Sequence, residues 1–267
     1  MSISTELTTL STNITNAYNA IQRKGGTIPT NKNTQNLSSA INSISAGGGS
    51  NYEEDLINMI SNRDTLTSVN FPNGITTIGS SAFRDCSNLA LTSLPSGITS
   101  IDDNAFSDCQ SLALTSLPSG ITSIGNSTFT NCRNLALTSL PSGITSIGSY
   151  AFSGCRSLAL TSLPSGITSI GNGTFTNCTN LALTSLPSGI TNIGNYAFSG
   201  CTSLTSLRIG SNIQTIAKNA FYACSNLTTI YINLPRATVE AMSSYSSKWG
   251  ATNATIICND DAGWVEA

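Results

Sequence analysis

The sequence contains no histidine, and only 9% of its 267 residues are charged. The missing imidazole removes the commonest general base and the commonest metal ligand. In a typical soluble domain about a quarter of the residues are charged, and here the formal net charge is only −2. Because such a surface has little electrostatic attraction for phosphate backbones, we expect no nucleic-acid partner.

Long apolar runs and catalytic motifs are also missing from the sequence. No stretch approaches the roughly 20 apolar residues that span a bilayer, so we expect no membrane insertion. Residues 1–30 lack the charged start and apolar centre of a secretory signal, which predicts a chain that stays in the cytoplasm of its producer until it is assembled or released. No serine has a histidine partner, and neither a nucleophile elbow nor a phosphate loop occurs. We therefore expect a protein that is not an enzyme and holds no cofactor or metal.

An internal repeat of 23 residues dominates the sequence. It consists of seven equally spaced phenylalanines, each followed three residues later by a cysteine. These pairs begin with Phe83 and Cys86 and end with Phe221 and Cys224. Five consecutive copies, the first at Leu89, open with the identical string LALTSLPSGIT. Repetition at this period predicts a solenoid in which stacked coils share one core.

The copy that begins at Leu112 shows what one coil should contain. A first strand is expected over 112–117 and should end at Pro118, which cannot donate to a ladder. A second extended piece over 121–124 alternates apolar and polar residues, and the step from Phe129 to Cys132 suits one helical turn. The sequence thus predicts a leucine-rich-repeat solenoid with mostly short parallel β-strands, one helical turn per coil and capped ends.

The central five copies differ from the outer ones in the first part of the coil. Outer copies such as 204–209 follow Leu-x-x-apolar-x-apolar. In the central copies the middle apolar residue stands at the third position and not at the fourth. We expect a change of strand register or a β-bulge there, and the sequence leaves both open. The shifted residues are Leu91, Leu114, Leu137, Leu160 and Leu183.

The domain organisation follows from composition. We expect a helical attachment segment over 1–45, a glycine-rich linker over 46–50, a solenoid with a helical N-cap over 51–232, and a C-terminal cap over 233–267. In that cap, 237–247 should be helical, and Trp249 with a strand over 254–257 should close the stack.

The N-terminal segment carries an apolar seam at steps of three and four. Two arrangements are open. The seam either packs on a second helix over 35–44 as a hairpin, or forms a homo-oligomer, which we take to be a trimeric coiled coil. The proposed oligomerisation residues are Leu7, Leu10, Ile14 and Ile21.

The motif Leu-Thr-Ser-Leu-Pro-Ser-Gly-Ile-Thr-Ser-Ile-Gly-x-x-Ala-Phe-x-x-Cys resembles the BspA-like class of bacterial leucine-rich repeats, over about residues 64–232. Relatives of that class are typically surface adhesins, so the resemblance implies binding of a protein or glycan. Two shorter segments, 14–29 and 249–256, are similar to parts of phage and prophage tail-associated proteins. Together they favour a virion appendage.

Chemically, the seven repeated cysteines occupy one equivalent position per coil. Neighbouring strands lie about 4.8 Å apart, which suits neither converging disulfide partners nor a tetrahedral zinc site. We expect buried reduced thiols, with Cys258 outside the column and therefore a candidate for an exposed, reactive thiol. The acidic cluster at Asp102, Asp103 and Asp108 is either a solvated turn or an ion site.

Variation between the copies clusters after the second isoleucine, and we take this edge as the candidate binding surface. Tyr150 and Tyr196 are its proposed aromatic anchors, although neutral drift on an exposed face would give the same pattern. Threonine columns, such as Thr99 to Thr191, are an alternative surface for a polysaccharide or ice, or they simply solvate the coil. The other proposed contacts are Arg133, Arg156, Asp102 and Asp103.

These observations lead to one functional prediction with one alternative. We expect a receptor-binding component of a phage or prophage tail, attached to other virion tail proteins through its N-terminal segment and contacting a host cell-surface protein or polysaccharide. The alternative is an adhesin of the same repeat class on a bacterial cell surface.

Overall fold

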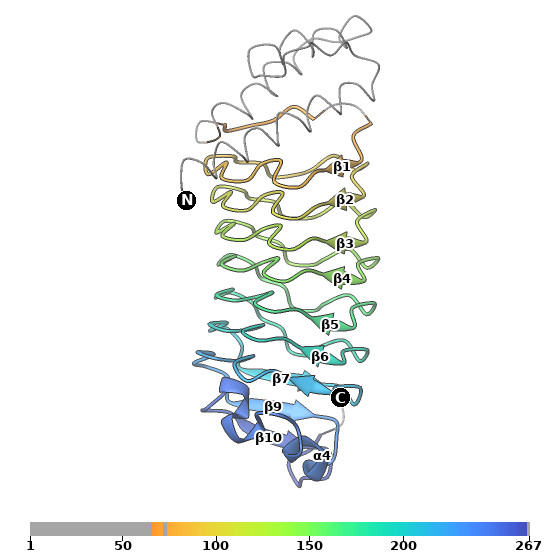
Figure 1. Cartoon of the computed structure of the whole chain (residues 1–267), viewed down its shortest axis with the longest axis vertical. Helices are drawn as coiled ribbons and strands as arrows, with labels where there is room; N and C mark the ends of the chain where they lie inside the picture. Colours follow the sequence, from red (N-terminus) through yellow and green to blue (C-terminus); the bar gives the residue numbers. More distant parts are fainter. Residues whose placement is uncertain (1–62, 64–65, 72–73, 266–267) are drawn as a thin grey trace, which may run out of the picture. The chain divides into compact units, whose positions relative to one another are not determined.

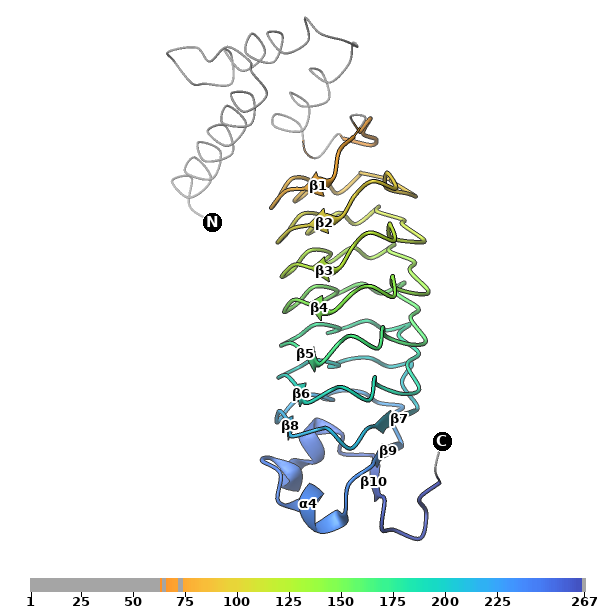
Figure 2. The same ribbon diagram turned by 90° about the vertical axis from the view of Figure 1, so that its right-hand side faces the viewer.

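The structure is a computed structural model that describes residue 63 and residues 66–71 and 74–265. The predicted N-terminal helices, the 46–50 linker and the proposed oligomerisation residues Leu7, Leu10, Ile14 and Ile21 lie outside these residues. What is described is a solenoid of about eight coils with a C-terminal cap. Figures 1 and 2 show the coils stacked one above the other.

Two columns of short parallel strands run along the stack. Figure 2 shows β1 to β6 and β8 along one side of the coils, and β7, β9 and β10 on another. Residue n pairs with residue n+23 in the first column, as in Ile124 with Ile147. The strands are β1 (Thr77–Ile78), β2 (Ser100–Ile101), β3 (Ser123–Ile124), β4 (Ser146–Ile147), β5 (Ser169–Ile170), β6 (Asn192–Ile193), β7 (Ser206–Ile209), β8 (Thr215–Ile216), β9 (Thr229–Ile232) and β10 (Thr255–Cys258).

The first strand predicted for the central copies is absent. Residues 112–117 form no strand, and one hydrogen bond, from the Ala136 amide to the Leu114 carbonyl at 3.1 Å, joins this part of the coil to the next. Leu112, Leu114 and Leu117 are all buried. This spacing breaks the alternation that a strand requires, and Pro118 offers no amide hydrogen. The outer copies keep the alternation, and there β7 and β9 form and pair along four residues.

The predicted helical turn is wrong. Ser127 and Asn131 have positive φ angles of 52° and 58°, which no right-handed helix contains. Instead, alternate amides point along the stack: Ser127, Phe129 and Asn131 donate to carbonyls of the next coil at 2.9, 2.8 and 2.7 Å. The Thr130 and Cys132 amides bond locally: Thr130 donates to the Ser127 carbonyl and Cys132 to the Phe129 carbonyl, both at 3.1 Å.

The core consists of columns of identical side chains. Rings from Phe83 to Phe221 stack with centroids 5.2 to 5.7 Å apart and planes within 13° of parallel. Such pairs add about 0.5–1.5 kcal/mol each beyond the burial of their area. Leucine and isoleucine columns complete the interior, so each coil supplies one layer of a shared core.

The residues after β9 cover the last coil, and they differ from the sequence prediction in one respect. The helix expected over 237–247 is two short pieces, α4 (Arg236–Glu240) and η2 (Tyr245–Gly250), because Ser244 between them has a φ of 65°. Trp249 is fully buried, and its carbonyl accepts a 3.0 Å hydrogen bond from the Phe221 amide. β10 pairs with β9 along four residues. Within the described residues, no helix is long and apolar enough to cross a membrane.

Candidate binding surface

The turn edge of each coil is the segment between the second isoleucine and the next leucine, for example 148–157. In six coils, from Ser81 to Gly200, two residues have left-handed backbone there; in coil 148–157 they are Tyr150, with φ 58°, and Gly154, with φ 76°. Alternate amides bond the next coil. The segment contains buried positions, such as the phenylalanine and the cysteine, and exposed ones, such as Tyr150. Sequence changes at its exposed positions therefore leave the core intact.

Tyr150 and Tyr196 occupy the first left-handed position of two coils that are separated by one coil. Their side chains are 46% and 40% exposed. Equivalent positions elsewhere hold small or polar residues, namely Asn104, Ser127 and Gly173. The fold itself thus requires no aromatic ring at this position.

The neighbouring coils hold these tyrosines in place. A Cβ atom on Gly173 would lie 2.3 Å from the Tyr150 ring, so the ring covers that glycine. Thr130 of the preceding coil donates a 2.8 Å hydrogen bond to the Tyr150 carbonyl, and Thr176 donates one of 2.7 Å to the Tyr196 carbonyl. The coils that carry Tyr150 and Tyr196 therefore alternate with the coils that carry Thr130 and Thr176.

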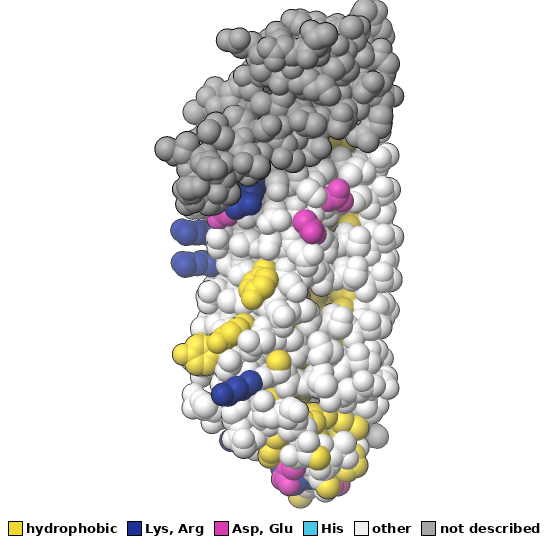
Figure 3. Space-filling model, in the orientation of Figure 1, with side chains coloured by type: hydrophobic (Ala, Val, Ile, Leu, Met, Phe, Trp, Pro, Cys, Tyr) yellow, Lys and Arg dark blue, Asp and Glu magenta, His cyan; other side chains and the backbone are white. Residues whose placement is uncertain are grey.

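Tyr222 is a third exposed ring that the sequence analysis did not single out. It is 56% exposed, and its ring meets that of Tyr196 edge-on with centroids 6.4 Å apart. The signal was available, because most equivalent positions hold serine or threonine. We call Tyr150, Tyr196 and Tyr222 the tyrosine strip. Figure 3 shows hydrophobic side chains on this face at the level of β4 to β7, with lysine and arginine side chains at its edge.

Arg133 and Arg156 follow the cysteines of two adjacent coils and are exposed. Among the described residues, neither takes part in an ion pair. Lys218, one residue before the position that aligns with Tyr150 and Tyr196, is likewise exposed and takes part in no ion pair among the described residues.

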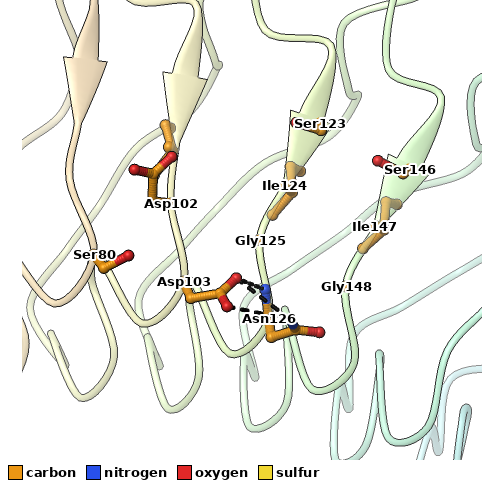
Figure 4. Close-up of a pocket in the computed structure, with 11 residues that line it drawn as sticks. Ser80, Asp102, Asp103, Ser123, Ile124, Gly125, Asn126, Ser146, Ile147 and Gly148 are labelled. Atoms are coloured by element: carbon orange, nitrogen blue, oxygen red, sulfur yellow. Dashed lines mark hydrogen bonds between the residues drawn. The ribbon is translucent and has the colours of Figure 1, made fainter.

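The predicted acidic residues form a separate feature. Asp102 and Asp103 line a shallow groove of about 520 Å³ over β2, β3 and β4, and its lining includes none of the tyrosines or arginines. Figure 4 shows the Asp103 carboxylate turned toward Asn126, whose backbone amide donates to it at 2.6 Å. Ser100 donates to Asp102 at 2.6 Å. Asp103 thus accepts hydrogen bonds from the next coil, and Asp102 accepts one from its own coil.

The threonine column is also occupied by internal bonds. The hydroxyls of Thr99, Thr145 and Thr191 donate to carbonyls of the preceding coil at 3.2, 3.4 and 3.2 Å. These hydroxyls therefore use their hydrogen atoms to bond the preceding coil and cannot donate them to a ligand at the same time. This makes the threonine column less suitable as a ligand-binding surface.

The cysteine column forms inter-coil hydrogen bonds. Each thiol donates to the phenylalanine carbonyl of the preceding coil at 2.9 to 3.0 Å, from Cys109 to Cys224. Burial raises the pKa of the Cys132, Cys155 and Cys201 thiols well above the ordinary value, and that of Cys224 to about 11. None of the described cysteines forms a disulfide, and all of them are buried.

Cys258 corrects the expectation of an exposed, reactive thiol. Its side chain is fully buried as the last residue of β10, and burial is also the main cause that raises its pKa. In the described part of the chain, no group of three or more His, Cys, Asp or Glu residues is placed to hold a metal ion.

Comparison with known proteins shows that the chain is similar to leucine-rich repeat proteins of bacteria. A family model described as the BspA type leucine rich repeat region matches residues 58–182 and 145–249. A T. pallidum leucine rich repeat protein shares 26% identity with a TM-score of 0.52, over 72% of this chain and 87% of that protein.

More distant structures are similar over comparable lengths. A leucine-rich repeat protein from Bacteroides ovatus shares 25% identity, with a TM-score of 0.42, over 73% of this chain and 61% of that one. A leucine rich cell surface protein from Faecalibacterium prausnitzii shares 22%, with a TM-score of 0.31, over 72% of each chain. Comparison with curated proteins finds no match.

Proposed function

Because the chain belongs to the BspA-type leucine-rich repeat family, we propose that it is a non-enzymatic binding protein whose tyrosine strip contacts a ligand on a cell surface. The observation that carries this proposal is the exposure of the Tyr150 and Tyr196 rings, which are 46% and 40% exposed. Neighbouring coils hold the same left-handed backbone with Ser127 or Gly173. The fold therefore requires this backbone but no aromatic ring, whereas contact with a ligand explains the rings.

The bacterial cell surface is the location that we propose first, since the family resemblance implies adhesins. A phage or prophage tail is the second, and the observation that favours it is the similarity of segments 14–29 and 249–256 to tail-associated proteins. Trp249 in the latter segment also has a packing role in the cap, so that similarity weighs less than the repeats do.

The binding proposal is tested with the Tyr150→Ser, Tyr196→Ser double variant of the full chain. Serine is chosen because Ser127 occupies the same position with φ 52°. Labelled wild type should bind bacterial cell walls or epithelial cells in a pull-down, and the double variant should bind at least about tenfold less, in line with loss of aromatic anchors.

The matched control is Thr122→Val with Thr168→Val, which removes hydroxyls from the threonine column while keeping side-chain volume. It should bind like the wild type, and circular dichroism should show the same fold for all three proteins. Equal binding by the tyrosine variant, or no binding by the wild type to either surface, would overturn the proposal.

The tail alternative is tested by oligomeric state. Light scattering of the full chain should give a trimer if the Leu7–Ile21 seam is a coiled coil, and Leu10→Lys with Ile14→Lys should then give a monomer. A monomer for the unmodified chain would remove the trimeric appendage from consideration.

A further inference from the structure

Resting on the proposed binding function, we propose that the ligand of the tyrosine strip is an extended anionic polysaccharide that lies along the solenoid axis. Three properties of the described residues lead to this ligand class: the linear order of the rings, the sign of the surrounding charge, and the shape of the surface.

The rings follow the axis of the stack. Tyr150 covers Gly173 of the next coil, and Tyr196 meets Tyr222 of the coil after its own. Neighbouring phenylalanine rings below them are 5.5 to 5.7 Å apart, so Tyr150 and Tyr196, two coils apart, are separated by about 11 Å along the axis, twice one coil rise. Tyr222 lies one coil beyond Tyr196, with the ring centroids 6.4 Å apart. The rings therefore form an unevenly spaced row along the axis, which suits an extended chain.

Charge on this part of the solenoid has one sign. Between Asp108 and Glu240 the sequence contains no acidic residue but contains five basic ones. Arg208 is engaged with the Tyr231 ring and the Val265 carbonyl, and Arg236 with Asp261. The three cations left exposed are Arg133, Arg156 and Lys218, in the coils that carry or adjoin the strip.

An uncompensated positive field attracts an anionic partner and raises its association rate. No acidic side chain within these coils pairs with the three cations. Carboxylate, sulfate or phosphate groups on a ligand could therefore pair with Arg133, Arg156 and Lys218. A neutral polymer would form no ion pairs with these three cations.

The shape of the surface favours a sugar chain over a folded acidic protein. Tight protein interfaces seat aromatic anchors in well-packed, desolvated pockets, whereas the ring of Tyr222 stands 56% exposed and that of Tyr150 46% exposed. The apolar faces of sugar rings stack on such flat rings without a pocket. Nearby, the Asn172 amide oxygen accepts from the Asn195 amide, and the Thr176 hydroxyl donates to the Tyr196 carbonyl. The Asn172 NH2 group can still donate to sugar hydroxyls, and the Thr176 oxygen can still accept from them.

The test uses the full chain and three polymers: chondroitin sulfate, its chemically desulfated form, and poly-glutamate as an acidic polypeptide. Calorimetry at low salt should show binding to chondroitin sulfate at least about tenfold tighter than to poly-glutamate. Desulfation should weaken binding and lower its dependence on salt, since fewer counterions are then released.

Two variants separate the ring and charge contributions. Tyr150→Ser with Tyr196→Ser should weaken chondroitin sulfate binding about tenfold with an unchanged salt dependence. Arg133→Gln with Arg156→Gln should weaken it and also reduce the slope of log Kd against log salt concentration. Poly-glutamate binding as tight as the glycan would overturn the proposal in favour of an acidic protein, and unchanged binding by the tyrosine variant would overturn it in favour of charge alone.

A cell-surface assay keeps failure of this inference distinct from failure of the proposed function. Cell walls or epithelial cells are treated with periodate, which destroys sugar diols, or with protease, before binding. Tyrosine-dependent binding that survives periodate but not protease would retain the binding function and reject the polysaccharide. We expect the reverse: tyrosine-dependent binding should be lost after periodate treatment and should survive protease treatment.

Discussion

A single thiol per coil connects two coils. Cys155 donates to the Phe129 carbonyl at 3.0 Å from a fully buried position. Serine or alanine would fit the same space, but alanine has no donor and would leave the Phe129 carbonyl with only its 3.1 Å bond from the Cys132 amide. Loss of one such hydrogen bond costs about 0.5–1.5 kcal/mol. This explains at the residue scale why a small side chain with a donor repeats through the core.

Because these thiols are buried, stability should depend on alkaline pH. The folded pKa of Cys155 lies above the ordinary 9.0, so its stabilising contribution is complete below that value and is lost as the pH rises through the unfolded pKa toward the folded one. Above about pH 9, each neutral buried thiol steepens the fall in unfolding free energy by about 1.4 kcal/mol per pH unit.

Urea unfolding measured between about pH 8 and 11 checks this expectation. Cys155→Ala should be less stable than the wild type at pH 8, yet its free energy should fall less steeply with pH, by the amount for one thiol. Identical slopes for the two proteins would show that the thiol ionises freely in the folded state.

Glycine after the second isoleucine is set by the close approach of adjacent coils. A Cβ atom on Gly148 would lie 2.6 Å from both the Asn126 nitrogen and the Gly125 carbonyl carbon, which are backbone atoms that cannot rotate away. We expect Gly148→Ala to destabilise the protein by about 1–3 kcal/mol, as overpacking does. Gly143→Ala is the matched control, since its Cβ would meet nothing nearer than the Ile121 oxygen at 3.9 Å.

Thermal and urea unfolding of both alanine variants tests the argument. Gly143→Ala should lie within about 0.5 kcal/mol of the wild type or slightly above it. Equal losses at the two positions would mean that backbone entropy, and not coil spacing, decides the choice of glycine.

At the scale of the element, the sequence predicted some parts of the coil and missed others. The strand ending at Ile124 was expected because Ile121 and Ile124 bracket two polar residues, and apolar columns at a fixed period leave little choice of register. The strand over 112–117 was wrongly expected, since Leu114 is buried by a backbone bend that no periodicity reports.

The turn edge was mistaken for a helical turn for a similar reason. A step of three from Phe129 to Cys132 fits both a helix and tandem turns, and only the inter-coil bonds of alternate amides distinguish them. Tyr150 and Tyr196 were found by comparing copies within the chain. Tyr222 was missed because its coil belongs to the divergent end, where no close copy exists for comparison.

Within the cap, an ion pair with supporting bonds ties α4 to the residues that follow β10. Arg236 pairs with Asp261, which also accepts a 2.7 Å bond from the Cys258 amide. The hydrogen bond from Arg236 is the main cause that lowers the pKa of Asp261 to about 2. A carboxyl group with a lowered folded pKa stabilises above its unfolded pKa and loses that effect as the pH falls toward the folded value.

We therefore expect Asp261→Asn to lower the melting temperature at pH 7, with the difference from wild type shrinking between about pH 4 and pH 2. Glu240→Gln is the control. Its pair with Arg236 is 3.5 Å long and exposed, and such pairs contribute about 0–1 kcal/mol. A difference that persists unchanged at pH 2 would show that Asp261 acts by packing and not by charge.

For the solenoid as a whole, the cap decides whether the column of coils ends. β9 is covered by β10 on one side, and the Phe221 amide bonds the Trp249 carbonyl at 3.0 Å. Without the cap, the β9 edge and the last phenylalanine layer would face solvent, and an open parallel edge pairs readily with another chain. A chain ending at Ile232 should therefore self-associate.

A chain ending at Cys258 is the informative control, because it keeps Trp249 and β10 but loses Asp261. It should be less stable than the full chain and keep the full chain's oligomeric state in light scattering, whereas the chain ending at Ile232 should form larger species that grow with concentration. If both truncations behaved alike, the ion pair would be as necessary to termination as the covering strand. If neither associated beyond the full chain, the β9 edge would be protected by its own twist, and stacking would stop without a dedicated cap.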